Sequence, residues 1–201
     1  MPVGVAAVIG SYLFGGVPIG LLVGRAKGID DIRKYGSGNI GASNVLRVIG
    51  VRAGLFVWAM DAMKGLLPVV VARYALFPMV EPVPGTGVAA GAPERLWWLA
   101  AVALAAMVGH CFSPYLKLSG GRGVSTSLGV ILGLDWRVGV ICFACWVAIV
   151  AVTRYISLGS MIACALAAPI LCLFGAPAPL AMAIALVALV ALVGCSLDYG
   201  D

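Results

Sequence analysis

The chain alternates between long apolar stretches and short polar segments. Crossing the hydrocarbon core of a membrane takes about 20 helical residues, and most of the apolar stretches approach or exceed that length. Their hydrophobicity is continuous rather than alternating, so they predict helices and not the strands of a membrane barrel. The expected spans are residues 3–24, 51–76, 95–112, 136–153, 158–174 and 178–195. A further apolar stretch, residues 123–133, is too short to cross alone and predicts a partial or tilted helix.

Composition points the same way. Of the 201 residues, 63% are hydrophobic and only 10% are charged, whereas a soluble domain carries about 25% charged residues. Backbone groups inside lipid must be hydrogen-bonded internally, which continuous apolar segments achieve as helices. We therefore expect an all-α integral membrane protein, a bundle of about seven transmembrane helices with one of them short. No internal repeat is evident, so residues 1–201 are expected to form a single membrane-embedded domain.

Basic residues are distributed unequally between the two sets of loops. If the amino terminus lies outside and every predicted helix crosses, nine of the thirteen Lys and Arg residues fall inside and three outside, with Lys64 within a span. Positive charge favours the cytoplasmic side, so this orientation is expected, and it accounts for the net charge of +5 without nucleic acid. Residues 1–24 lack a basic leading region and run on as a full span, so no cleavable signal peptide is expected.

Three polar segments interrupt the apolar pattern. They are residues 36–47, 109–126 and 154–160, called here the first, second and third polar segments. In the expected topology all three lie on the cytoplasmic face. The charge count did not require this result, so it predicts that the three segments converge on one site.

The first polar segment has the composition of an anion-binding loop. Its glycines allow backbone N–H groups to approach a ligand closely, and its Arg side chain suits phosphate. The candidate ligands are Gly36, Ser37, Gly38, Asn39, Asn44 and Arg47. The segment also matches G-x-G-x-x-G, but the charged residues 30–35 do not form the preceding strand that a dinucleotide fold requires. The alternative interpretation is a solvated Gly/Ser/Asn loop.

The second polar segment contains a Gly-Gly-Arg-Gly turn that runs into a predicted helix at Val124. The amino terminus of a helix exposes free N–H groups and favours anions, so an oxyanion site is expected here. The candidate residues are Lys117, Gly120, Gly121, Arg122, Gly123, Ser125 and Thr126. The spacing of a Walker A loop is absent. The alternative is that the basic residues contact lipid headgroups.

Three ionisable residues in or beside the spans are candidates for the site: Asp61, Lys64 and His110. Asp61 and Lys64 are three residues apart and about three turns into a span, so they share a helix face and predict an ion pair that supports the site. His110 is a candidate general base, with a structural role as the alternative.

The third polar segment supplies one cation and two hydroxyl groups, from Arg154, Ser157 and Ser160. Its alternative role is helix capping. Cys142 and Cys145 form C-x-x-C, but they lie within an apolar run without a second pair, so they predict packing. No Ser-His-Asp arrangement is visible, so we expect no strong protein base. No cluster of metal ligands is visible either, and we expect neither a metal site nor a cofactor.

Together these motifs resemble the bacterial acyl-phosphate:glycerol-3-phosphate acyltransferase family over residues 5–195. The resemblance is carried by Gly36-Ser37-Gly38-Asn39 with Asn44 and Arg47, Asp61 with Lys64-Gly65, Gly109-His110 with Gly120-Gly121-Arg122-Gly123, and Arg154-Tyr155 with Ser157 and Ser160. It implies a multi-pass protein of the bacterial inner membrane with a cytoplasm-facing site. The family transfers a fatty acyl group from acyl phosphate to the 1-hydroxyl of glycerol 3-phosphate, which yields lysophosphatidic acid and phosphate. The expected partners are these two substrates and membrane lipid, with the chain as a monomer.

On this resemblance we assign catalytic roles to Ser37, Arg47, Arg122 and Ser160. Ser37, Asn39 and Arg47 are expected to hold one phosphate, and the Arg122 loop with Ser160 the other phosphate or the reacting carbonyl. The leaving phosphate itself can accept the hydroxyl proton, which removes the need for a protein base.

Two features depart from the family pattern. The family usually has Lys where Arg122 stands, and it closes with a basic segment carrying His and Asn and later Glu, none of which occurs in residues 194–201. The second departure favours an impaired or diverged member as one alternative. A small membrane transporter is another, although its polar breaks should lie near the bilayer midplane rather than at the ends of spans.

Overall fold

The structure is a computed structural model, and it describes residues 1–77, 81–82, 89–90 and 93–196. The α-helices are α1 (Pro2–Gly15), α2 (Ile19–Ala26), α3 (Ala42–Val48), α4 (Val51–Val71), α5 (Pro93–Cys111), α6 (Val124–Leu134), α7 (Trp136–Thr153), α8 (Ile156–Leu173) and α9 (Ala178–Ser196). Single turns of other helix types are η1 (Ile32–Lys34), η2 (Ala72–Leu76) and η3 (Pro114–Leu116). The short strands β1 (Glu81–Pro82) and β2 (Ala89–Ala90) pair antiparallel.

The apolar helices agree with the predicted spans. Within the described residues, five apolar stretches are long enough to cross a membrane: Pro2–Ala26, Val51–Leu76, Glu94–Leu116, Trp136–Thr153 and Ile156–Leu173. Two shorter apolar helices, Val124–Leu134 and Ala178–Val193, complete the set. The prediction of an all-α membrane bundle with a short helix at residues 123–133 is therefore confirmed. Most of the predicted outer loop at residues 77–94 lies outside the described residues.

The first span contains a break that its hydropathy did not predict. Helix α1 ends at Gly15 and α2 begins at Ile19, with Pro18, which has no N–H to donate, between them. The backbone carbonyls freed at the break are satisfied from other elements. Ser113 Oγ donates to Gly16 O at 2.6 Å, and Lys64 Nζ donates to Val17 O at 2.9 Å. The break is thus tied to α4 and to the second polar segment.

Small residues allow α4 and α6 to pack closely. A Cβ atom added at Gly65 would overlap the backbone carbonyl of Thr126, and one at Gly129 would overlap that of Ala62. Such contacts between small residues are the usual means of helix association in membranes, where no water is expelled. They hold α6 directly against the helix that carries Asp61.

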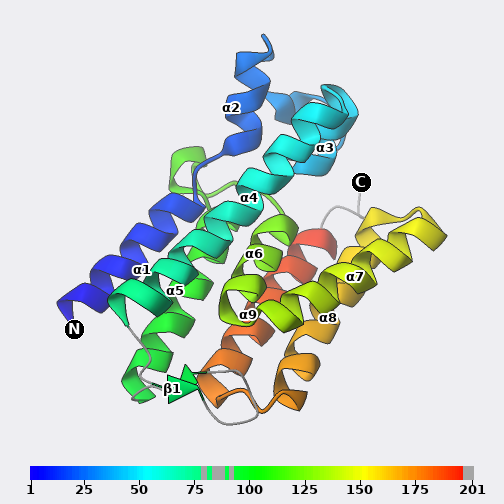
Figure 1. Cartoon of the computed structure of the whole chain (residues 1–201). Helices are drawn as coiled ribbons and strands as arrows, with labels where there is room; N and C mark the ends of the chain where they lie inside the picture. The colour runs from blue at the N-terminus through cyan, green and yellow to red at the C-terminus, as the bar shows by residue number, and fades with distance from the viewer. Residues whose placement is uncertain (78–80, 83–88, 91–92, 197–201) are drawn as a thin grey trace.

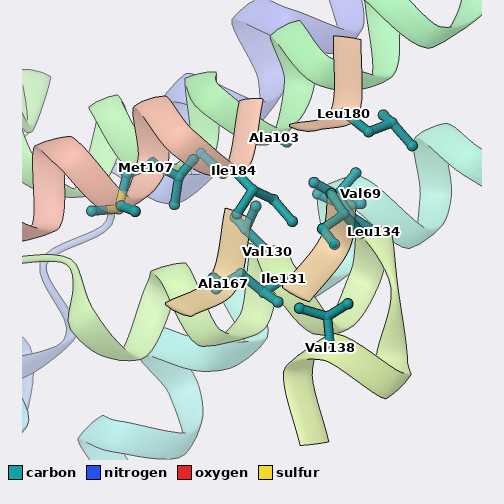
Figure 2. Close-up of a cluster of buried hydrophobic side chains, with 14 of the residues drawn as sticks. Val69, Ala103, Met107, Val130, Ile131, Leu134, Val138, Ala167, Leu180 and Ile184 are labelled. Atoms are coloured by element: carbon teal, nitrogen blue, oxygen red, sulfur yellow. The ribbon is translucent and has the colours of Figure 1, made fainter. Parts of the chain in front are cut away.

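The buried core surrounds α6. Figure 2 shows Val130 and Ile131 of α6 beside Ala167 of α8 and Ile184 of α9, and all four side chains are at most 3% exposed. A helix enclosed on several sides has a fixed axis. The amino end of α6, which follows the Gly-Gly-Arg-Gly turn, is therefore held in a defined place.

The polar segments lie toward one end of the bundle. In Figure 1, α2, α3 and the turn between α7 and α8 are at the upper end of the molecule. Strand β1 and the connection from α8 to α9 are at the lower end. This arrangement brings segments that are distant in sequence close enough to share a site.

Candidate functional site

A cavity of about 300 Å³ receives residues from all three polar segments. The predicted site residues that line it are Asn39, Asp61, His110, Arg122, Gly123, Ser125, Ser157 and Ser160. They come from the loop before α3, from α4 and α5, from α6 and the loop before it, and from α8. The expected convergence of the three polar segments is therefore present.

The other part of the cavity wall is apolar and aromatic. Trp58 of α4 lies 5.8 Å from Phe143 of α7 between ring centroids, and Phe143 stacks on Trp146 at 5.9 Å. The sequence analysis did not single out several lining residues, including Ser43, Leu55, Trp58, Ser127, Phe143, Trp146 and Cys164. Phe143 and Trp146 are three residues apart and so share a helix face. This spacing is the sequence signal for the aromatic wall, and the sequence analysis did not use it. The cavity as a whole is amphipathic.

Asn44 supports the first polar segment from behind. Its Oδ1 accepts from the Ser37 N–H at 2.8 Å, and its Nδ2 donates to the backbone carbonyls of Ile32, Tyr35 and Asn39 at 3.2, 3.1 and 2.7 Å. The side chain is completely buried and does not line the cavity. Asn44 was expected to bind the ligand, but in the structure it holds the backbone of the loop in place instead. Gly36, with φ of 63°, comes so close to Asn44 that an added Cβ would overlap Oδ1.

Ser37 and Arg47 lie outside the cavity lining. Ser37 Oγ is buried and makes no hydrogen bond within the described residues, whereas Arg47 is exposed on α3. Arg47 is four residues beyond Ser43, which does line the cavity, so the two share one face of α3. Gly38 is exposed, with φ of 71°, and is also outside the lining.

An ion pair closes the turn that leads into the first polar segment. Arg33 donates from Nη2 to Asp31 Oδ2 at 2.8 Å and from its backbone N–H to Oδ1 at 3.0 Å. The hydrogen bonds from the Arg33 side chain lower the pKa of Asp31 to about 2, so the carboxylate is ionised at neutral pH. The ion pair therefore fixes the turn η1, which lies just before the first polar segment in the sequence.

The second polar segment folds back onto the end of α5. The Gly120 N–H donates to Cys111 O at 2.9 Å and the Gly121 N–H donates to His110 O at 3.1 Å. Gly121 packs so closely on His110 that an added Cβ would overlap Nε2. Gly123, with φ of 79°, then turns the chain into α6, whose first residues Val124 and Ser125 line the cavity.

The predicted ion pair between Asp61 and Lys64 is confirmed. Lys64 Nζ lies 2.8 Å from Asp61 Oδ1, and both side chains are 4% exposed. Thr126 Oγ1 donates to the Asp61 carbonyl at 3.0 Å, which fixes α6 against α4. His110 Nδ1 lies 3.9 Å from Asp61 Oδ1. Lys64 and Thr126 support the cavity from behind without lining it.

The third polar segment contributes through α8. Ser160 Oγ donates to Ile156 O at 2.9 Å and accepts from Trp146 Nε1 at 3.1 Å, so this hydroxyl connects the polar and aromatic walls. Arg154 ends α7 with φ of 65° and is exposed outside the lining. Lys117 is also exposed and outside the lining. The structure therefore separates the predicted cations: Arg122 lies at the cavity, and the other two lie on the surface.

The fold and the site together define an integral membrane protein with an amphipathic cavity at one end of its helical bundle. The sequence matches the glycerol-3-phosphate acyltransferase family over residues 5–195, so the chain belongs to that family and is an acyltransferase. The protein of that name from Geobacter sulfurreducens is 45% identical over 155 residues, which are 77% of this chain and 71% of the relative. Its counterpart from Roseobacter denitrificans is 38% identical over 91% of this chain and 82% of its own.

Solved structures show the same architecture. The crystal structure of PlsY, an integral membrane glycerol 3-phosphate acyltransferase, in its glycerol 3-phosphate form is similar with a TM-score of 0.84 and 28% identity. The similarity covers 98% of this chain and 90% of PlsY. The lysophosphatidic acid form of PlsY is similar with a TM-score of 0.79 over 94% of this chain and 86% of PlsY.

Proposed function

We propose that this chain transfers a fatty acyl group from an acyl phosphate to the 1-hydroxyl of glycerol 3-phosphate. The products are lysophosphatidic acid and inorganic phosphate. The observation that carries the proposal is the amphipathic cavity, which joins Arg122 and the amino end of α6 to the aromatic wall of Trp58, Phe143 and Trp146. An acyl phosphate has the same division between an anionic head and an apolar chain. The forms in which PlsY was solved support the acceptor and the product.

The two phosphate groups are assigned to different polar segments. The free N–H groups at the start of α6 and the Arg122 guanidinium suit one phosphate or the reacting carbonyl, with Ser160 beside them. Asn39, Ser37 and Arg47 are assigned to the other phosphate. Arg47 enters this assignment because it shares a helix face with Ser43, a lining residue.

The proposed reaction is a direct acyl transfer. The hydroxyl oxygen of glycerol 3-phosphate attacks the acyl carbonyl carbon, and the bond between that carbon and the bridging phosphate oxygen breaks. The electron pair leaves with the phosphate, and the hydroxyl proton passes to a phosphate oxygen. Donors around Arg122 stabilise the charge that develops on the carbonyl oxygen. Holding both substrates together supplies the remaining acceleration without a protein base.

The site is proposed to face the cytoplasm of a bacterial cell from the inner membrane. Within the described residues, the basic first polar segment and the turn at Arg154 lie at the end of the bundle away from β1. Positive charge favours the cytoplasmic side. The chain is proposed to act as a monomer and to take its acyl donor from the surrounding lipid.

The test is an acyl-transfer assay on the purified full chain. We expect palmitoyl phosphate with glycerol 3-phosphate to give lysophosphatidic acid and phosphate in equal amounts, and palmitoyl-CoA to give none. Arg122→Ala should lower kcat at least about 100-fold, because a donor to the developing charge is lost. Arg47→Ala should abolish transfer while the protein remains folded in membranes.

Arg52→Ala is the matched control, since Arg52 is exposed at the start of α4 and outside the cavity lining. Its activity should equal that of the wild type. Full activity in Arg47→Ala would refute the role of that residue. Phosphate release without acyl transfer, or no turnover of acyl phosphate by the wild type, would contradict the proposed function.

A further inference from the structure

Asp61 and His110 belong to the cavity lining and place two buried polar atoms near each other. Asp61 Oδ1 and His110 Nδ1 lie 3.9 Å apart, which is too far for a direct hydrogen bond. Both side chains line the cavity and are only 3% exposed as residues. Within the part of the chain that the structure describes, His110 Nδ1 has no hydrogen-bond partner, and Asp61 Oδ1 has the Lys64 ammonium at 2.8 Å.

Buried polar atoms without a partner are uncommon and call for an explanation such as a bound ligand. Lys64 lies 2.8 Å from Asp61 Oδ1 and compensates its charge, but it directs a hydrogen bond to Val17 O. A carboxylate oxygen has two lone pairs, so Asp61 Oδ1 can accept one further hydrogen bond beside that of the ammonium. Among the described residues, no protein group forms hydrogen bonds to both Asp61 Oδ1 and His110 Nδ1.

The separation of the two atoms suits one oxygen atom. An atom about 2.8 Å from each of two groups that are 3.9 Å apart sits at normal hydrogen-bond distance from both. A hydroxyl group donates one hydrogen bond and accepts another, so it satisfies an acceptor and an N–H donor together. A carbonyl or ether oxygen only accepts, so it can bond to the N–H but not to the carboxylate.

The neighbouring elements hold both side chains in place. Thr126 donates to the Asp61 backbone carbonyl at 3.0 Å. Gly121 packs directly against the His110 imidazole, and its N–H donates to the His110 carbonyl at 3.1 Å. A binding site formed from rigid helices and a close-packed turn keeps its geometry without the ligand.

We propose that Asp61 and His110 form a hydroxyl-binding subsite that takes one hydroxyl group of the glycerol substrate. This assignment rests on the proposed function for the identity of the substrate. The two side chains act by positioning the acceptor, with Asp61 accepting from the hydroxyl and His110 donating to it. An ordered water has the same hydrogen-bonding chemistry, so the experiment must separate the two sources.

The experiment measures equilibrium binding by calorimetry and needs no acyl donor. The ligands are glycerol 3-phosphate and two deoxy analogues: 3-hydroxypropyl phosphate, which lacks the secondary hydroxyl, and 2-hydroxypropyl phosphate, which lacks the primary one. We expect the wild type to bind one analogue at least about tenfold more weakly than glycerol 3-phosphate. In His110→Leu, which has no donor, that ratio should fall to about one to twofold. His110→Asn should restore most of it, because its amide N–H occupies a similar position to Nδ1.

The wild-type comparison remains decisive even if His110→Leu fails to fold. Equal affinity for glycerol 3-phosphate and both analogues would overturn the subsite and assign the two atoms to water. A preference that persists unchanged in folded His110→Leu would also overturn it. Failure of the proposed function is distinguishable, since it appears as absent acyl transfer from palmitoyl phosphate whatever the binding ratios are.

Discussion

Asn44 shows how an uncharged residue can support a site built for anions. Its amide oxygen accepts from one backbone N–H, and its two amide N–H donors are shared among three backbone carbonyls around the turn from Ile32 to Asn39. These groups would otherwise be buried without partners or would require another loop conformation. The position of Asn39 at the cavity therefore depends on a side chain that does not reach the cavity.

Replacing this side chain tests that dependence. Asn44→Ala should cost on the order of 2–3 kcal/mol of stability, because several hydrogen bonds are lost and buried groups are left unsatisfied. For a chain of this size that corresponds to a lower Tm by roughly 4–12 °C, measurable by thermal unfolding in detergent. Acyl transfer should fall with it. Ser43→Ala, on the same helix but exposed, should leave the Tm unchanged, and an unaltered Tm in Asn44→Ala would contradict the supporting role.

At the level of elements, the contact between α4 and α6 determines the shape of the cavity. Asp61 belongs to α4, and the turn carrying Arg122 leads into α6. Gly129 allows the two helices to meet at the backbone of Ala62. Any side chain at that position must push α6 away from α4 and so separate the groups at the polar end of the cavity.

Gly129→Ala should therefore destabilise the protein by about 1–3 kcal/mol, as overpacking in a well-packed interior does. The measurement is again the Tm in detergent, together with kcat/KM for glycerol 3-phosphate. Gly10→Ala is the control, because nothing lies within 4 Å of a Cβ added there. That variant should be neutral or slightly stabilising, since Ala favours helix over Gly. Equal effects of the two changes would show that the α4–α6 contact is not tight.

At the level of the whole molecule, the distribution of charge sets the expected orientation in the membrane. The end of the bundle that carries the first polar segment holds the basic surface residues Lys34 and Arg47, and β1 lies at the opposite end. If the basic end faces the cytoplasm, the substrate cavity draws on cytosolic glycerol 3-phosphate.

Cysteine labelling in intact cells checks this orientation. Lys34 and Glu94 are both exposed. In the proposed orientation Lys34 lies on the cytoplasmic side of the membrane and Glu94 on the outer side. A membrane-impermeant maleimide should label Glu94→Cys from outside and Lys34→Cys only after the cells are permeabilised. The unmodified chain, whose described cysteines belong to apolar helices, provides the background. Labelling of Lys34→Cys in intact cells would reverse the proposed orientation.

The sequence by itself determined the features that depend on local order along the chain. Continuous apolar runs predicted the spans, because crossing lipid requires a helix of sufficient length. The three-residue spacing of Asp61 and Lys64 predicted their ion pair, which is observed at 2.8 Å. The motifs in the polar segments carried the family resemblance, which the match over residues 5–195 confirms.

Only the tertiary structure decided which faces of these helices meet. The break at Pro18 is satisfied by Ser113 and Lys64, residues far away in sequence. The aromatic wall combines α4 with α7, and His110 faces Asp61 from another helix. Hydropathy describes how each segment interacts with lipid, but close packing between helices depends on small residues and long-range hydrogen bonds that no local pattern contains.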